Sequence, residues 1–366
     1  MRRPGDLDVS ETDGPLVPER ILELSERLST VAGGKIGEIS SINREAKMLA
    51  INAMITAARA GEAGKAFAIV AEEFKRISSE IDEVAGALES QVRVDLTELS
   101  AVGGAILAHL RGQRLADLAL NAIEIIDRNL YERTCDVRWW ATDSAVVACA
   151  AEPSDQAARH ASRRLRVILD AYTVYLDLWI CAPDGQVLAT GRPDRYPTAK
   201  TATAAGAGWF KDALRTRSGD EFVACDIERV PALAGAPVAT YATAIREGGR
   251  ADGEIVGVLG IHFDWSPQAH AVVDGVRLTE DERARSRVML LDRQGRVIAA
   301  SDRRGELEEV FRLPADSADL GSYAVEGVTV GHALTPGYET YRGLGWRGCI
   351  VQREPQEATA SRKRAA

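Results

Sequence analysis

The sequence predicts an α+β protein, because two kinds of hydrophobic periodicity divide it. Up to about residue 143, apolar side chains recur every three or four positions, which is the spacing of one face of a helix. From about residue 174, apolar and polar residues alternate between turns that contain Gly and Asp, as in antiparallel strands. The first region predicts an antiparallel helical hairpin, a coiled coil, followed by a long helix. The second predicts two antiparallel αβ modules.

Composition excludes several classes of protein. The chain has 366 residues, enough for two or three domains, and a formal net charge of -9, so no overall basic field favours nucleic acid. We interpret the short basic clusters at 163–166 and 362–364 as solvated surface. No run of about 18 apolar residues predicts a membrane span, and no signal-peptide core follows the N-terminus. We therefore expect a cytoplasmic protein.

Residues able to carry catalysis or bind metal are scattered. The five cysteines form no CxxC pair, and the five histidines form no HxxxH pair. No phosphate-binding loop or dinucleotide fingerprint occurs. We expect neither an enzyme nor a bound cofactor.

The hairpin is predicted from two helical arms around a turn rich in small residues. In both arms mostly apolar residues recur in steps of three and four, and we expect this seam to pack knobs into holes against a partner helix. Its members are Ile39, Ile42, Ala46, Leu49, Ala53 and Thr56 in the first arm, and Phe67, Val70, Phe74, Ile77, Ile81, Val84 and Leu88 in the second. Gly33-Gly34 predicts a flexible or broken point in the first arm. Around the turn, Arg59, Glu62 and Glu73 have little to do within an isolated hairpin, so they are available to a partner.

Residues 48–73, MLAINAMITAARAGEAGKAFAIVAEE, resemble the cytoplasmic hairpin tip of methyl-accepting chemotaxis proteins. That tip contacts the CheW adaptor and the CheA kinase. The resemblance implies that the partner-binding residues are Asn52, Arg59, Glu62, Ile69 and Glu73. Arg44 stands where the family usually has an aromatic residue, and Thr56 where it usually has Glu. Regular trimers of dimers are therefore not expected, and no segment resembles the family's methylation sites.

Strands and turns organise the second half. We expect strands over 174–182, 186–190, 221–227, 237–245 and 255–265, and again over 287–292, 296–300, 323–328, 331–335 and 346–352. Helices are expected over 156–172 and 209–216. The strand–turn–strand unit beginning at Leu178 returns about 110 residues later at Met289, a weak internal repeat.

A long helix followed by two such PAS-like modules resembles a double Cache sensor domain, and residues 257–264 match it best. The expected division is a disordered tail over 1–15, the hairpin over 16–95, a connecting helix over 96–145, a ligand-binding module over 146–275, a second module over 276–352, and a polar tail over 353–366.

By this resemblance, a small organic ligand binds in the first module. The expected ligand-binding residues are aromatic and acidic: Tyr175, Asp177, Trp179, Trp209, Asp226, Tyr241, His262 and Asp264. Such a cage suits an amine, because cation–π contacts and charged hydrogen bonds both stabilise one. The amino-acid-sensing subgroup has Arg where this chain has Ala207, so a standard amino-acid receptor is not expected.

Two functions fit these observations. The first is a chemotaxis-type transducer, a homodimer in which ligand binding changes the hairpin's contact with CheW and CheA. The second is a ligand-binding interaction protein that uses the hairpin for dimerisation only, which Arg44 and Thr56 favour.

Overall fold

A computed structural model describes residues 19–354, which form two compact units that meet between Arg111 and Gly112. Each unit is described by itself. The tails expected over 1–15 and beyond residue 354 lie outside the described residues, as does the basic cluster at 362–364, whereas Arg353 ends the last strand.

The first unit is a pair of helices joined by a short turn. Helix α1 spans Glu19–Arg59, the 3-10 helix η2 spans Gly61–Gly64, and α2 begins at Lys65 and ends at Trp140. Gly61 has a φ of 63°, which few residues other than Gly adopt, so it lets the chain reverse. Helix α1 is not broken at Gly33-Gly34, where a flexible or broken point was expected, and α2 is continuous through Gly103-Gly104.

The two arms do not pack through the apolar seam that the spacing predicted. The buried positions recur every seven residues and are mostly small: Ile36, Asn43, Ala50 and Ala57 in α1, Gly64 in η2, and Ala71, Ser78 and Ala85 in α2. Small side chains are favoured at this contact because they let the two helix backbones approach closely. A Cβ on Gly64 would lie 2.2 Å from the Ala57 carbonyl oxygen. Most of the predicted seam is instead exposed, as Phe67 at 66% and Val84 at 68% illustrate.

In the second unit, the rest of α2 is followed by two helices and a sheet. Helix α3 spans Ser144–Ala151 and α4 spans Asp155–Ala171, and the side chains of Asp143 and Ser154 cap their N-termini. The sheet has the order β2-β1-β6-β5-β3, and β4 also pairs with β5. Its strands are β1 (Tyr175–Cys181), β2 (Val187–Thr190), β3 (Val223–Ala224), β4 (Glu228–Val230), β5 (Ala236–Arg246) and β6 (Ile255–Asp264). Between them lie η3 (Pro197–Thr201), α5 (Gly208–Ala213), η4 (Pro231–Leu233) and η5 (Glu247–Gly249).

A second antiparallel sheet follows α6 (Trp265–Gly275) and α7 (Glu280–Ala284). Its order is β8-β7-β11-β10-β9. The strands are β7 (Ser286–Leu291), β8 (Val297–Ala300), β9 (Leu320–Val325), β10 (Val328–Leu334) and β11 (Arg347–Arg353). The predicted internal repeat is visible here, because β7-β8 and β1-β2 share an antiparallel pairing with a register shift at the same place, after Ile180 and after Leu290.

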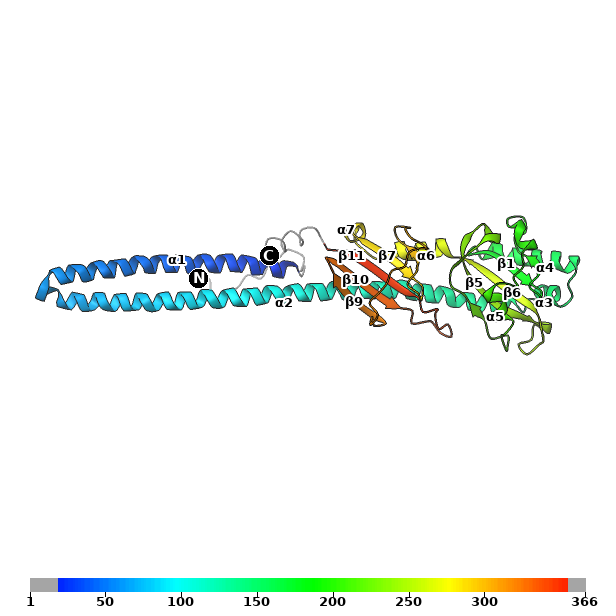
Figure 1. Cartoon of the computed structure of the whole chain (residues 1–366), viewed down its shortest axis with the longest axis horizontal. Helices are drawn as coiled ribbons and strands as arrows, with labels where there is room; N and C mark the ends of the chain where they lie inside the picture. The colour runs from blue at the N-terminus through cyan, green and yellow to red at the C-terminus, as the bar shows by residue number, and fades with distance from the viewer. Residues whose placement is uncertain (1–18, 355–366) are drawn as a thin grey trace, which may run out of the picture. The chain divides into compact units, whose positions relative to one another are not determined.

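One face of each sheet joins a common core with α2 (Figure 1). In the second sheet this contact depends on glycine: a Cβ on Gly331 or Gly348 would lie 2.4 Å and 2.2 Å from backbone atoms of Leu115 and Ala119. The other face of each sheet carries a smaller apolar cluster of its own. The α+β class and the two antiparallel modules are as predicted, whereas α3, α6 and α7 were not predicted.

Candidate functional site

The tip of the hairpin exposes all five residues that the sequence predicted to bind a partner. Asn52 and Arg59 lie seven residues apart on α1, and Ile69 and Glu73 lie one turn apart on α2, with Glu62 in η2 between the arms. Ile69 is 71% exposed, although it is apolar. The tip therefore presents charged side chains on both arms together with one exposed apolar side chain.

Two of these charged residues, Glu62 and Glu73, form ion pairs within the hairpin, contrary to expectation. The Glu62 carboxylate lies 2.5 Å from Lys65 Nζ, and Glu73 accepts hydrogen bonds from Arg76. The hydrogen bond from Arg76 lowers the pKa of Glu73. Exposed ion pairs of this kind contribute about 0–1 kcal/mol, so a partner can exchange them at little cost.

The hairpin also exposes an apolar face below the tip. A groove of about 250 Å³ lies between the arms, and its lining includes Ile39, Ile77, Val84 and Leu88. Isolated apolar side chains on a surface are ordinary, but a continuous row along two helices is typical of an interaction face.

In the first module, part of the predicted ligand set meets on the face of the sheet that α5 covers. Trp179 and Trp209 both pack against His262, with ring centroids 4.3 Å and 5.7 Å away. Gly260 leaves room for the Trp209 ring, because a Cβ at position 260 would lie 2.9 Å from the indole. The His262 Nδ1 atom lies 3.1 Å from Thr240 Oγ1, while its Nε2 is buried without a partner in the described structure.

Burial lowers the pKa of His262 to about 3, so its imidazole is neutral at pH 7. A neutral ring with one unpartnered nitrogen, flanked by two indoles, can exchange one hydrogen bond with a small ligand. Thr240 and Gly260 were missed from the sequence. Strand alternation alone would have placed both on the face of His262.

Asp177 lies beside this cluster but already has its hydrogen bonds. Its carboxylate accepts from the backbone N–H groups of Leu178, Gly191 and Arg192 and from the Trp179 indole N–H, all at 2.9–3.1 Å. Burial raises the pKa of Asp177 to about 6, against the effect of these donors. Asp177 therefore fixes the loop after β2 and orients Trp179.

Asp264 ends β6, two residues beyond His262, and is half-buried. Burial raises its pKa, and the charge of nearby Arg195 opposes that change. Arg195 also lies over the ring of Tyr196, which is buried. Neither residue was predicted, since the loop after β2 has no periodicity that would place it.

The other three predicted residues do not join this cluster. Tyr175 and Tyr241 belong to the core on the opposite face, where the Tyr175 hydroxyl donates to Asp136 of α2. For Tyr175 the cause is the register shift between Tyr175 and Asp177, which places its side chain on the opposite face of the sheet from the one that strand alternation predicted. Asp226 accepts a hydrogen bond of 2.6 Å from the Trp346 indole of the second module. The eight predicted residues thus do not gather in one cluster in this structure.

Other chemistry is weak in the described part of the chain. Burial raises the pKa of the Cys225 thiol to about 11, which makes it a poor nucleophile at pH 7. Within residues 19–354, no group of three or more His, Cys, Asp or Glu residues is placed to hold a metal ion. None of the described helices combines the length and hydropathy needed to cross a bilayer.

Known proteins resemble the two parts separately. A family model for the methyl-accepting chemotaxis protein signalling domain matches residues 20–109. Methyl-accepting chemotaxis protein PcaY of Pseudomonas putida is 30% identical over 140 residues, 36% of this chain and 24% of PcaY. Transducer protein Htr18 of Halobacterium salinarum is 48% identical over 62 residues, 16% of this chain and 8% of Htr18. The chain thus spans at most about a quarter of these relatives.

The second part resembles a solved sensor domain. The crystal structure of the Vibrio cholerae histidine kinase DctB sensor domain matches with a TM-score of 0.50 and 12% identity, covering 65% of this chain and 95% of that one. At this identity the match supports the fold alone, and it agrees with the sensor fold predicted from the sequence. Residues 20–109 thus match the signalling domain of methyl-accepting chemotaxis proteins, and the second part of the chain has a fold similar to that of a solved sensor domain.

Proposed function

We propose that this protein is a chemotaxis-type sensory transducer in which a small ligand in the first module changes how the hairpin tip contacts CheW and CheA. The observation that carries the proposal is the continuity of α2, which contributes one arm of the signalling hairpin and, from Gly112 to Trp140, the core of the sensor unit. A ligand can shift the equilibrium between two states of such a helix only by as much as its binding free energy differs between them.

The ligand site we propose is the His262 cluster rather than the full predicted set. Trp179, Trp209 and His262 supply aromatic faces and one unpartnered nitrogen, and Asp264 supplies a carboxylate. An amine-bearing organic compound suits this chemistry, because indole faces and carboxylates both attract a cation.

The proposed adaptor and kinase surface is Asn52, Arg59, Glu62, Ile69 and Glu73. These residues are exposed and lie within the matched signalling domain. We also expect the protein to act in the cytoplasm, where the family's hairpin tips meet their kinase.

A pull-down of purified CheW and CheA by the full chain tests this proposal. We expect binding by the wild type, weaker binding by Glu62→Lys, and unchanged binding by Glu89→Lys, a charge reversal at another exposed position, on α2. If the wild type captures neither protein, the transducer proposal fails.

The alternative is a ligand-binding protein that dimerises through the hairpin without contacting a kinase. The exposed apolar groove favours it, because such a face fits the same face of a second copy of the hairpin without any kinase. CheA autophosphorylation measured with and without the chain separates the two functions, since only the transducer changes the rate.

A further inference from the structure

The second module contains a cavity of its own, separate from the His262 cluster. It has a volume of about 520 Å³ and lies where the β7-β8 turn, the start of β11 and residues 311–313 meet. Cavities that bind small molecules commonly measure about 300–1,000 Å³. The volume is therefore sufficient for a compound of moderate size.

Part of the cavity lining is apolar. Leu291 is buried, and Phe311 and Leu313 are half-buried where they pack against the apolar cluster on the outer face of the second sheet. This lining faces away from the core that the sheet shares with α2, since Leu291 and Leu290 alternate between the two. It suits a hydrocarbon chain or ring.

Three arginines, Arg293, Arg312 and Arg347, complete the lining. Among the residues that the structure describes, Arg293 and Arg312 make no hydrogen bond or ion pair, and both are exposed. The one carboxylate in the lining, Asp292, is buried and already paired with Arg296 at 2.8 Å. The rim therefore carries positive charge that no acidic neighbour in the lining neutralises.

The third arginine is held in place by the module itself. Arg347 donates to the Ala318 carbonyl oxygen at 3.0 Å and lies 3.4 Å from His332 Nδ1, with the Asp319 carboxylate 3.9 Å away. Burial and the charge of Arg347 both lower the pKa of His332. This favours the neutral ring, which does not repel the Arg347 guanidinium. Arg347 is thus a cation fixed by hydrogen bonds, and it shares the cavity lining with Arg293 and Arg312, which have no such bonds among the described residues.

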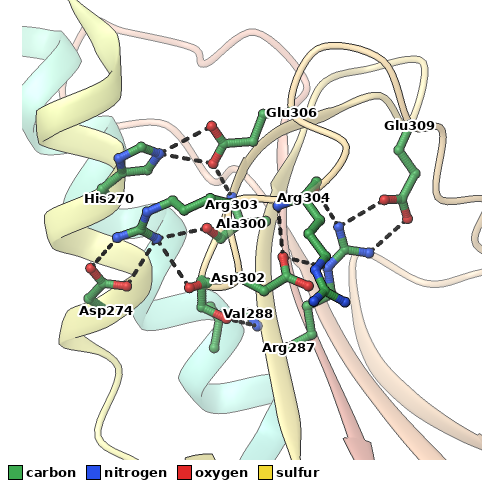
Figure 2. A network of polar contacts seen from close by, with 11 residues as sticks. His270, Asp274, Arg287, Val288, Ala300, Asp302, Arg303, Arg304, Glu306 and Glu309 are labelled. Atoms are coloured by element: carbon green, nitrogen blue, oxygen red, sulfur yellow. Dashed lines mark hydrogen bonds and ion pairs between the residues drawn. The ribbon is translucent and has the colours of Figure 1, made fainter.

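The wall that carries Phe311 is also fixed. Figure 2 shows the preceding segment bound to its neighbours by contacts that include His270 with Glu306, Arg303 with Asp274, and Arg287 with Glu309. The Phe311 N–H then donates to the Gly295 carbonyl oxygen at 2.8 Å. A wall held in this way loses little freedom when a ligand binds.

We propose that this cavity is a second ligand site, selective for an amphipathic carboxylate. The anionic head would meet Arg293 and Arg312, with Arg347 behind them, and the apolar tail would cover Leu291, Phe311 and Leu313. A larger cavity of about 740 Å³ beside α4 is a weaker candidate, because Asp155 and Asp170 share its lining with Arg159, Arg163 and Arg166.

Calorimetric titration of the full chain with octanoate tests the proposal. We expect saturable binding, with octan-1-ol, which lacks the charge, and acetate, which lacks the tail, each binding at least tenfold more weakly. Arg293→Gln combined with Arg312→Gln should weaken octanoate binding at least tenfold, about 1.4 kcal/mol. Arg342→Gln, an exposed arginine of the same module outside the cavity lining, should leave it unchanged.

A second variant guards against an indirect effect of the charge changes. Leu313→Trp should fill the cavity and abolish binding, while the thermal unfolding midpoint stays near that of the wild type because Leu313 is only half-buried. The proposal is overturned if neither octanoate nor benzoate binds the wild type at about 1 mM, which corresponds to only about 4 kcal/mol. It is also overturned if binding survives the double substitution but is lost in Trp209→Ala, which would assign the ligand to the first module. Neither result depends on contact with CheW or CheA.

Discussion

His262 lies at the centre of the proposed first site, and its burial has a measurable consequence. The unfolded chain's imidazole takes up a proton below its ordinary pKa of 6.5, whereas the folded ring resists protonation down to about pH 3. Below pH 6.5 the unfolded state therefore binds more protons than the folded state. Stability must fall as pH falls through this window.

We expect His262 to reduce the free energy of unfolding by about 2 kcal/mol between pH 7 and pH 5. Urea unfolding of the wild type and of His262→Gln at both pH values measures this, and the difference between the two pH values should shrink by that amount in the variant. His160→Gln, an exposed histidine, is the matched control and should behave as the wild type. Equal pH dependence in all three proteins would contradict the buried, neutral ring.

At the scale of the element, glycines decide how the second sheet meets α2. A Cβ on Gly348 would lie 2.2 Å from the backbone oxygen of Ala119, and neither backbone can move without disturbing the shared core. We expect Gly348→Ala to lower the free energy of unfolding by more than about 2 kcal/mol. Gly321→Ala, whose Cβ would meet only the His332 ring at 3.7 Å, should cost far less in the same urea titration.

The exposed apolar row of the hairpin leads to a prediction about association. If this face binds a second copy, Val84→Glu places a charge within the apolar groove and should shift the dimer to monomer, because a buried unpaired charge costs several kcal/mol. Sedimentation equilibrium measures the mass, and Glu83→Ala, an exposed neighbour, should leave it unchanged. A wild type that is monomeric at every concentration would refute the dimer.

These elements also mark how far sequence reasoning reaches. Helical spacing predicted both arms, but each arm has two stripes, and periodicity alone cannot say that the small residues such as Ala50 and Ala71 face the other arm. Alternation predicted the strands, yet one register shift in β1 turned Tyr175 to the opposite face from Trp179. Arg293 and Arg312 lie in turns and irregular segments, where no period indicates that they share a cavity.

For the whole molecule, the proposal requires that α2 transmit the ligand's effect as one continuous helix. Gly104 is the sharpest place to test this, because it lies within α2 and a Cβ there would meet nothing within 4 Å. Gly104→Ala should keep the helix and stabilise it by about 1 kcal/mol, whereas Gly104→Pro should break it, at a cost of about 3 kcal/mol.

With a ligand found by thermal-shift screening of small acids, amines and nucleobases, both variants should still bind that ligand and still capture CheW. Only Gly104→Pro should lose the effect of ligand on CheA autophosphorylation, because both sites remain but the helix that joins their domains does not. The alanine variant controls for loss of the glycine itself. If the proline variant keeps full ligand control of the kinase, the signal does not travel along α2, and the second module or the dimer contact must carry it instead.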